Sequence, residues 1–176
     1  QELLQIPGEL DDLQARITLA RFLKANLGIS VKMFFKFDLL PLQELILKSI
    51  LIRDNSLVVA ARGFAKSTLI SLLTLYMPIF YPGSKGVIIS TNFRSSRRIL
   101  EEAEKLVKRK EKGELLRHCF SEDMKRANDL FRIRIVENGS EVSALPLSSG
   151  EGLRGTRATW VCIDEGLLIS KDIQEN

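Results

Sequence analysis

The stretch VVAARGFAKST, from Val58 to Thr68, decides the predicted fold. It belongs to a run of small and β-branched apolar residues, Ser56 to Ala61, which is typical of a short buried strand. A turn containing glycine follows, and the apolar segment from Lys66 to Phe80 predicts a buried helix that stops at Pro82-Gly83. A turn between a strand and a helix directs backbone N–H groups and the positive helix end at one point. The stretch therefore predicts a site for a phosphate group.

The spacing matches the phosphate-binding pattern G-x-x-x-x-G-K-[ST], except that alanine stands at both glycine positions, Ala60 and Ala65. In that pattern the lysine reaches the β- and γ-phosphates and the following hydroxyl binds magnesium. If position 65 requires a positive φ, alanine costs roughly 1–2 kcal/mol there, which strains the loop without abolishing it. The alternative is an ordinary strand-to-helix connection. The predicted nucleotide-binding residues are Ala61, Arg62, Gly63, Phe64, Ala65, Lys66, Ser67 and Thr68, with Ser67 also a metal ligand.

An acidic pair, Asp164 and Glu165, follows another apolar segment, Thr159 to Ile163. In open parallel sheets, ligands gather at the carboxyl ends of strands, so the pair is predicted to face the phosphate loop. Asp164 would hold Mg²⁺ through water, and Glu165 would orient and activate the attacking water. A surface acidic pair at a strand end is common, but both motifs in this order predict a nucleoside triphosphate site.

The rest of the pattern predicts an α/β fold. Helical spacing over residues 10–27, 40–51 and 94–113 alternates with apolar segments, of which Gly86 to Thr91 is a second buried strand. Continuous apolar strands between long helices predict a mainly parallel sheet flanked by helices. The acid directly after Asp164 favours hydrolysis. It also indicates the additional-strand, catalytic-glutamate group of ATPases, with Gly86 to Thr91 as the candidate for the strand between the two motifs.

Two further segments complete the predicted fold. Residues 131–147 alternate apolar and polar around Asn138-Gly139, which predicts an antiparallel hairpin. The segment VKMFFKF, residues 31–37, is predicted to be extended. Near it, Gln43 follows Pro41, and a glutamine side chain can pair with both the donor and the acceptor edge of adenine. Gln43 is therefore predicted to select ATP, and a solvent-facing glutamine on a helix is the alternative.

Composition excludes several classes of protein. The 176 residues are 45% hydrophobic and 27% charged, as in ordinary globular domains, and the net charge of +4 is compatible with nucleic acid. The single histidine, His118, gives no zinc-ligand spacing with Cys119 and Cys162. The longest apolar run, Leu69 to Phe80, is too short to span a bilayer, so no membrane is expected. The chain begins without methionine, and we expect it to be a piece of a longer protein.

In combination, these motifs resemble the ATPase domain of the large terminase subunit of tailed bacteriophages, from about Leu40 to Asn176. The resemblance is carried by Pro41-x-Gln43, ARGFAKST, STN, GLRGTR and WVCIDEG, and Arg62 in the loop is its most telling residue. It implies an ATP-driven motor that packages double-stranded viral DNA into a procapsid in the host cytoplasm. The implied partners are other copies of the chain in a ring, a portal protein and a small terminase subunit.

The resemblance also implies a domain organisation. Residues 1–40 would form an N-terminal helical lead, and residues 41–176 a P-loop ATPase domain that stops before the family's coupling motif. The family's nuclease domain is not part of this chain, so no nuclease activity is expected. Two other functions stay open. One is a helicase or another DNA-translocating ATPase, and the other is a catalytically silent nucleotide- or DNA-binding module, against which the retained Lys66, Ser67, Asp164 and Glu165 argue.

Two arginines are assigned separate catalytic roles. Arg62 lies inside the phosphate loop, so it can reach only the nucleotide of its own chain. Arg154 precedes the strand Thr159 to Ile163, which spans about 16 Å at roughly 3.3 Å per residue, and so starts far from its own phosphates. We therefore expect Arg62 to act in cis and Arg154 in trans, as an arginine finger worth about 10³–10⁵ in rate. A loop-bracing or DNA-backbone arginine is the alternative for Arg154.

A basic cluster opens the predicted helix 94–113. Cations at a helix start oppose the helix dipole, and a phosphate ligand would explain them. We assign the cluster to the DNA backbone or to a subunit interface, with sequence-independent, salt-sensitive contacts. Its members are Arg94, Arg97 and Arg98.

Overall fold

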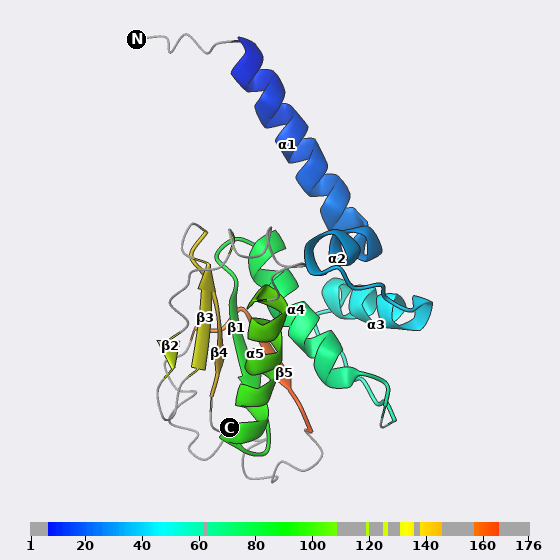
Figure 1. Ribbon diagram of the computed structural model, residues 1–176, viewed down its shortest axis with the longest axis vertical. Helices are drawn as coiled ribbons and strands as arrows, with labels where there is room; N and C mark the ends of the chain where they lie inside the picture. Colours follow the sequence, from blue (N-terminus) through cyan, green and yellow to red (C-terminus); the bar gives the residue numbers. More distant parts are fainter. Residues whose placement is uncertain are drawn as a thin grey trace.

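A mixed sheet of five strands carries the fold, in the order β2-β3-β4-β1-β5 (Figure 1). The computed structural model describes residues 7–61, 63–108, 119, 125–126, 131–135, 138–145 and 157–165. β1 pairs in parallel with both β4 and β5, whereas β3 pairs antiparallel with β2 and β4. The strands are β1 (Lys85–Ile89), β2 (Lys125–Arg126), β3 (Phe131–Ile135), β4 (Ser140–Ala144) and β5 (Trp160–Ile163).

Five helices accompany the sheet in the described residues. α4 and α5 pack side by side on one face of the sheet, and α2 and α3 pack beside α4 (Figure 1). α1 projects away from the rest of the chain, with Leu13, Leu19 and Phe22 about half exposed. The helices are α1 (Pro7–Ala25), α2 (Leu27–Phe35), α3 (Pro41–Ile52), α4 (Lys66–Phe80) and α5 (Phe93–Lys108).

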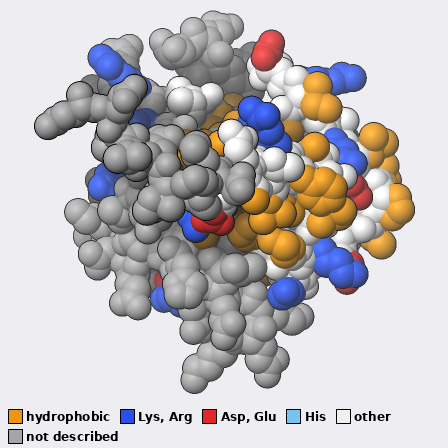
Figure 2. All heavy atoms as spheres, turned by 90° about the horizontal axis from the view of Figure 1, so that it is seen from above, with side chains coloured by type: hydrophobic (Ala, Val, Ile, Leu, Met, Phe, Trp, Pro, Cys, Tyr) orange, Lys and Arg blue, Asp and Glu red, His pale blue; other side chains and the backbone are white. Residues whose placement is uncertain are grey.

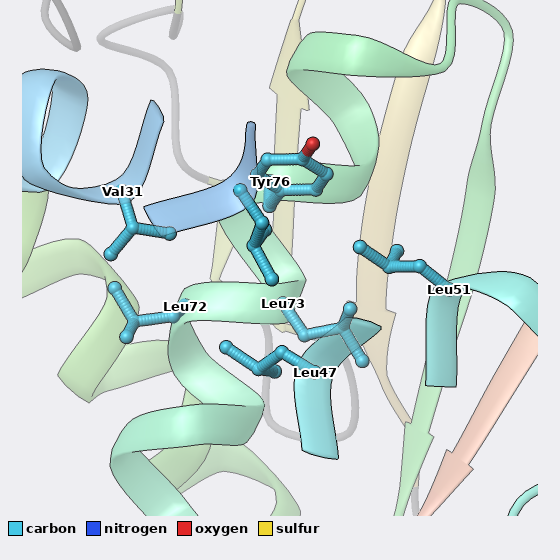
Figure 3. A pocket seen from close by; sticks show the side chains of 7 residues that line it. Val31, Leu47, Leu51, Leu72, Leu73 and Tyr76 are labelled. Atoms are coloured by element: carbon cyan, nitrogen blue, oxygen red, sulfur yellow. The ribbon is translucent and has the colours of Figure 1, made fainter. Parts of the chain in front are cut away.

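The core forms where one face of the sheet meets α4 and α5. Strand register places Ile88, Ala144 and Phe131 in one row across three strands, because Ile88 pairs with Ala144 and Ala144 pairs with Phe131. All three are buried against apolar residues of both helices. At the other side of α4, apolar side chains of α2 and α3 close around a small apolar cavity that is too narrow for a water molecule (Figure 3). The cavity is lined by Leu27, Val31, Leu47, Leu51, Leu72, Leu73 and Tyr76.

Close contact with Trp160 holds β5 beside β1. Gly86 pairs with Trp160, and a Cβ atom at residue 86 would overlap the indole ring. The indole Nε1 donates a hydrogen bond to Ser84 Oγ at 2.8 Å. The strand that carries the acidic pair is therefore positioned by a glycine and an aromatic ring far from each other in the sequence.

Several sequence predictions are confirmed. The long apolar helix runs from Lys66 to Phe80 as expected, and β1 and β5 form at the predicted apolar segments. The predicted hairpin forms from β3 and β4, with Asn138 and Gly139 at its turn and Gly139 at a φ of +69°. In each of these elements, the local sequence pattern and the packing against the rest of the chain favour the same structure.

One prediction about the fold holds in part and two are wrong. The sheet is flanked by helices and β1 pairs in parallel on both sides, but β2 and the predicted hairpin make the other pairs antiparallel, so the sheet is mixed. Residues 31–35 are helical, not extended, since α2 buries Leu27, Val31 and Phe35 at helical spacing. The segment Ser56–Ala61 forms no strand, and Leu57 and Val59 are 85% and 82% exposed.

The candidate for the additional strand also needs correction. The segment Gly86 to Thr91 contains most of β1, and both edges of β1 are taken, by β4 and by β5. The segment that precedes the phosphate loop, Ser56–Ala61, is outside the described sheet. The segment Gly86 to Thr91 therefore does not lie between Ser56–Ala61 and β5.

Two further features concern the exposed apolar side chains and the helices. Hydrophobic side chains gather on the side of the molecule where α2 and α3 lie, among them the exposed Ile29, Leu42 and Leu45 (Figure 2). None of the helices in the described part of the chain is both long and apolar enough to cross a lipid bilayer.

Candidate functional site

The phosphate-loop segment adopts a left-handed turn directly before α4. Gly63 has a φ of +86°, and Ala65, the N-cap of α4, has φ and ψ of +61° and +34°. No side chain caps this helix end, and the first backbone bond back to the cap runs from Leu69 N to Ala65 O at 3.0 Å. The N–H groups of the first helical turn consequently have no helix partner and remain for another acceptor.

Alanine at position 65 thus occupies the conformation that glycine adopts without cost. Ala65→Gly is expected to raise the free energy of unfolding by about 1 kcal/mol, since the left-handed strain outweighs the extra chain entropy of glycine. It should also tighten ATP binding if the bound loop keeps this turn. Urea unfolding and titration calorimetry measure both effects.

Ala61→Gly is the matched control for that substitution. Ala61 lies in the same loop segment but is not among the residues with a positive φ, so glycine there should lower stability. Equal effects of the two substitutions on stability would show that residue 65 needs no glycine.

Lys66 and Asp164 carry the charges of the two predicted motifs. Lys66 Nζ donates a hydrogen bond to Ala60 O at 2.7 Å, so the side chain folds back over the loop. Burial raises the pKa of Asp164 above its usual range, and the neighbouring Glu165 charge adds to the rise. A backbone hydrogen bond from Glu165 and, most weakly, the charge of Lys66 act in the opposite direction. A partly desolvated carboxylate beside a second carboxylate is suited to a cation.

The end of β5 fixes where the acidic pair lies. Asp164 N donates to Ile89 O at 2.9 Å, which adds a last rung to the ladder between β1 and β5. Glu165 then takes a φ of +56°, and its side chain turns toward the chain that leaves β1. There Thr91 Oγ1 donates a hydrogen bond to Glu165 Oε2 at 3.2 Å. Both acids therefore stand beyond the carboxyl edge of two parallel strands.

The oxygen atoms of Ser67 and Asp164 suit a magnesium site in which a nucleotide supplies further ligands. Ser67 is exposed on the first turn of α4, and the carboxyl group of Asp164 is partly buried. The described residues contain no cluster of three or more His, Cys, Asp or Glu side chains that could hold a metal by themselves. Mg²⁺ commonly takes only one or two protein ligands and completes its shell with phosphate oxygens and water. The described side chains are consistent with that arrangement.

Gln43 is held by its own helix. Its side chain is 6% exposed, and Oε1 accepts a hydrogen bond from Leu40 N at 3.0 Å within the cap of α3. The solvent-facing alternative is thus wrong. The adenine contact stays a prediction, and it would have to use the amide NH₂ or replace the cap bond.

The basic cluster divides into paired and exposed members. Arg97 Nε lies 2.9 Å from Glu101 Oε1, one turn along α5, so an acid within the helix balances its charge. Arg94 and Arg98 are exposed. Asn92 caps the helix, because its Oδ1 accepts from Ser95 N at 2.8 Å. A contact of this cluster with DNA or with another subunit remains a prediction.

Two predicted catalytic residues, Arg62 and Arg154, lie outside the described residues. Thr91 was not predicted as a site residue. Its only signal in the sequence was its place in the STN motif directly after a buried strand, where a polar side chain can meet the acids that end the neighbouring strand.

No match was found among protein-family models or among curated proteins. Solved structures that are similar include two of one phage protein. The large terminase ATPase domain of Thermus phage P74-26 superposes with a TM-score of 0.58 at 17% identity, covering 81% of this chain and 59% of that one. An arginine-to-alanine mutant of the same domain gives a TM-score of 0.54 at 18% identity, covering 74% and 56%.

This chain therefore spans less than two thirds of the neighbours it resembles. At such identities the likeness concerns the fold. The resemblance that the motifs indicate is confirmed at that level: the chain has the fold of a phage large terminase ATPase domain.

Proposed function

We propose that the chain binds and hydrolyses ATP as the ATPase part of a motor that moves double-stranded viral DNA into a procapsid. The observation that carries the proposal is the uncapped, left-handed start of α4 at Lys66 and Ser67, in a chain whose acidic pair stands beyond the carboxyl edge of β1 and β5. The shared fold with a phage large terminase ATPase domain supports the same reading.

Each predicted site residue is assigned one role. Lys66 would exchange Ala60 O for phosphate oxygens, alongside the uncapped N–H groups of α4. Ser67 and Asp164 would hold Mg²⁺, which when bound neutralises charge on the β- and γ-phosphates. Glu165 would accept a proton from the attacking water. Arg62 in cis and Arg154 in trans would stabilise charge developing on the γ-phosphoryl group.

The same proposal places the chain in the additional-strand, catalytic-glutamate group. β5 is the outermost strand of the described sheet on its side, and Val161 and Ile163 are 53% and 57% exposed. Its free edge offers a place for a further strand between β5 and the apolar segment Ser56–Ala61, which is also exposed.

The wider assignment follows from the likeness to the terminase domain. DNA, further copies in a ring, a portal protein and a small terminase subunit would be the partners, in the cytoplasm of a bacterial host. Arg94 and Arg98 are exposed cations suited to a phosphate backbone, and such contacts should weaken as salt rises.

The proposal is tested by ATP binding and phosphate release with and without Mg²⁺, each with and without double-stranded DNA. The unchanged chain should bind ATP more tightly with Mg²⁺. In Asp164→Asn the increase in ATP affinity caused by Mg²⁺ should be at least about tenfold smaller, or ~1.4 kcal/mol, because the substitution removes the charged magnesium partner.

Asp54→Asn, at an exposed position before the phosphate loop, is the control and should behave like the unchanged chain. ATP binding that is absent, or that is indifferent to Mg²⁺ in every variant, would contradict the proposed function.

A further inference from the structure

The first helix, α1, carries apolar side chains that the rest of the chain leaves uncovered. Leu13, Leu19 and Phe22 are each about half exposed, and α1 stands away from the body of the molecule (Figure 1). Exposed apolar side chains that gather on one element mark an interaction surface. The question is which molecule covers this one.

The direction of α1 is fixed by its last turn. A single residue, Asn26, joins α1 to α2, and its backbone N and its Nδ2 both donate to Phe22 O, at 3.0 and 2.8 Å. Tyr76 OH of α4 donates to Lys24 O at 3.3 Å, and Lys24 Nζ lies 3.9 Å from the centre of the Tyr81 ring. The earlier turns of α1 therefore project in a defined direction, and a cover for their apolar side chains has to come from outside the described fold.

One apolar row on α1 has the spacing of a helix-pairing seam. Leu10, Leu13, Ile17 and Ala20 follow one another at steps of three, four and three residues. Helices of a coiled coil contact each other through apolar residues at this spacing. Leu19 is not part of the row, because six residues beyond Leu13 correspond to about 120° around the helix. The row is thus suited to a second helix.

The charges of α1 divide between its two halves. Three acids stand in the first half and three bases in the second: Glu9, Asp11, Asp12, Arg16, Arg21 and Lys24. Two copies of α1 that run in opposite directions would set the acids of each beside the bases of the other, whereas parallel copies would set like charges together. The helix is therefore complementary in charge to a second copy of itself in the antiparallel arrangement.

We propose that α1 is a self-association surface, on which two copies of this chain pair as antiparallel helices through the row of Leu13, Ile17 and Ala20. The contact is two-fold, so it joins one copy to one other. It lies near the end of α4 opposite to Lys66, so the phosphate loop stays accessible. The inference does not depend on the proposed ATPase function.

The size of α1 sets the strength expected of the pairing. At 1.5 Å per residue and about 10 Å across, its 19 residues have a lateral surface of roughly 900 Å², of which about half can face a partner. That area is smaller than the ~800 Å² per partner of a standard protein interface. The dimer should therefore be weak and depend on the concentration of the chain.

Sedimentation equilibrium without nucleotide, over roughly a hundredfold range of micromolar concentrations, tests the pairing. The average mass of the unchanged chain should rise toward twice that of one copy. Leu13→Glu should raise the dimer Kd at least about tenfold, because a two-fold contact buries this side chain once from each copy. Leu19→Glu is the matched control, since Leu19 is equally exposed on another side of α1, and its Kd should change less than about threefold. Circular dichroism checks that both variants are folded.

Two charge substitutions test the antiparallel direction. Asp12→Lys and Arg21→Glu should each weaken self-association, because each places like charges side by side in an antiparallel pair. An equal mixture of the two variants should associate more tightly than either alone, since one helix is then mainly basic and the other mainly acidic.

Four results would each overturn the proposal. A constant mass over the whole range would show that a second copy does not cover α1, and a mass above twice that of one copy would exclude a two-fold contact. Equal weakening by Leu13→Glu and Leu19→Glu would remove the row as the seam. Tighter self-association of either charge variant would show that the helices do not run antiparallel.

Discussion

Glu165→Gln is expected to lower the rate of ATP hydrolysis by about 10²–10⁴-fold, the usual contribution of a general base. The substitution is nearly isosteric, and the amide oxygen can still accept the hydrogen bond that Thr91 donates. Because Glu165 is exposed at the end of β5, the fold should be unaffected. ATP affinity should therefore stay within about twofold, since an interaction realised only in the transition state leaves binding unchanged.

Single-turnover phosphate release and equilibrium ATP binding, measured on the same preparation, separate the two effects. Glu102→Gln is the matched control, because Glu102 lies on α5, away from the ends of β1 and β5, and its ion pair with Lys105 Nζ is long, at 3.9 Å. A Glu165→Gln chain that turns over at the original rate would remove Glu165 from the mechanism. A chain that also loses ATP binding would show that the residue supports the structure of the site.

Lys66→Ala is expected to weaken ATP binding by roughly ten- to 150-fold, which corresponds to about 1.5–3 kcal/mol for hydrogen bonds from a charged donor. In the free chain the ammonium group donates to Ala60 O, and the proposal assigns the same donor to the phosphates when ATP binds.

Titration calorimetry with Mg²⁺-ATP measures this loss, and circular dichroism checks that the variant is folded. Lys85→Ala serves as the control, because Lys85 is exposed at the opposite end of β1 from the acidic pair. Binding that survives Lys66→Ala unchanged would show that the loop is not the nucleotide site.

Local signals predicted the elements in which pattern and packing agree. The helix from Lys66 to Phe80 has an apolar surface that the sheet and α5 bury, and the Asn138-Gly139 turn supplies the backbone conformation that a hairpin needs. The helix and the turn therefore form where residue type already favours the backbone. Ala65 is different, because it is held left-handed against the preference of alanine.

The predictions failed for segments whose secondary structure depends on contacts with residues elsewhere in the chain. Residues 31–35 contain phenylalanines that favour strands, yet Val31 and Phe35 form a helical row that packs into the core. The apolar segment Ser56–Ala61 has strand composition but no neighbouring strand among the described residues. Neither of these outcomes depends on the local pattern alone.

The sequence by itself determined the chemistry of the site: a lysine and a hydroxyl after a turn, and two adjacent acids after an apolar strand. Those features follow from residue type and short-range order. Only the tertiary structure decided that β5 lies directly beside β1, which joins Asp164 N to Ile89 O and places Thr91 against Glu165. The reason is physical, because strand neighbours are selected by long-range contacts such as the indole of Trp160 over Gly86, and these join segments that no short window of sequence contains.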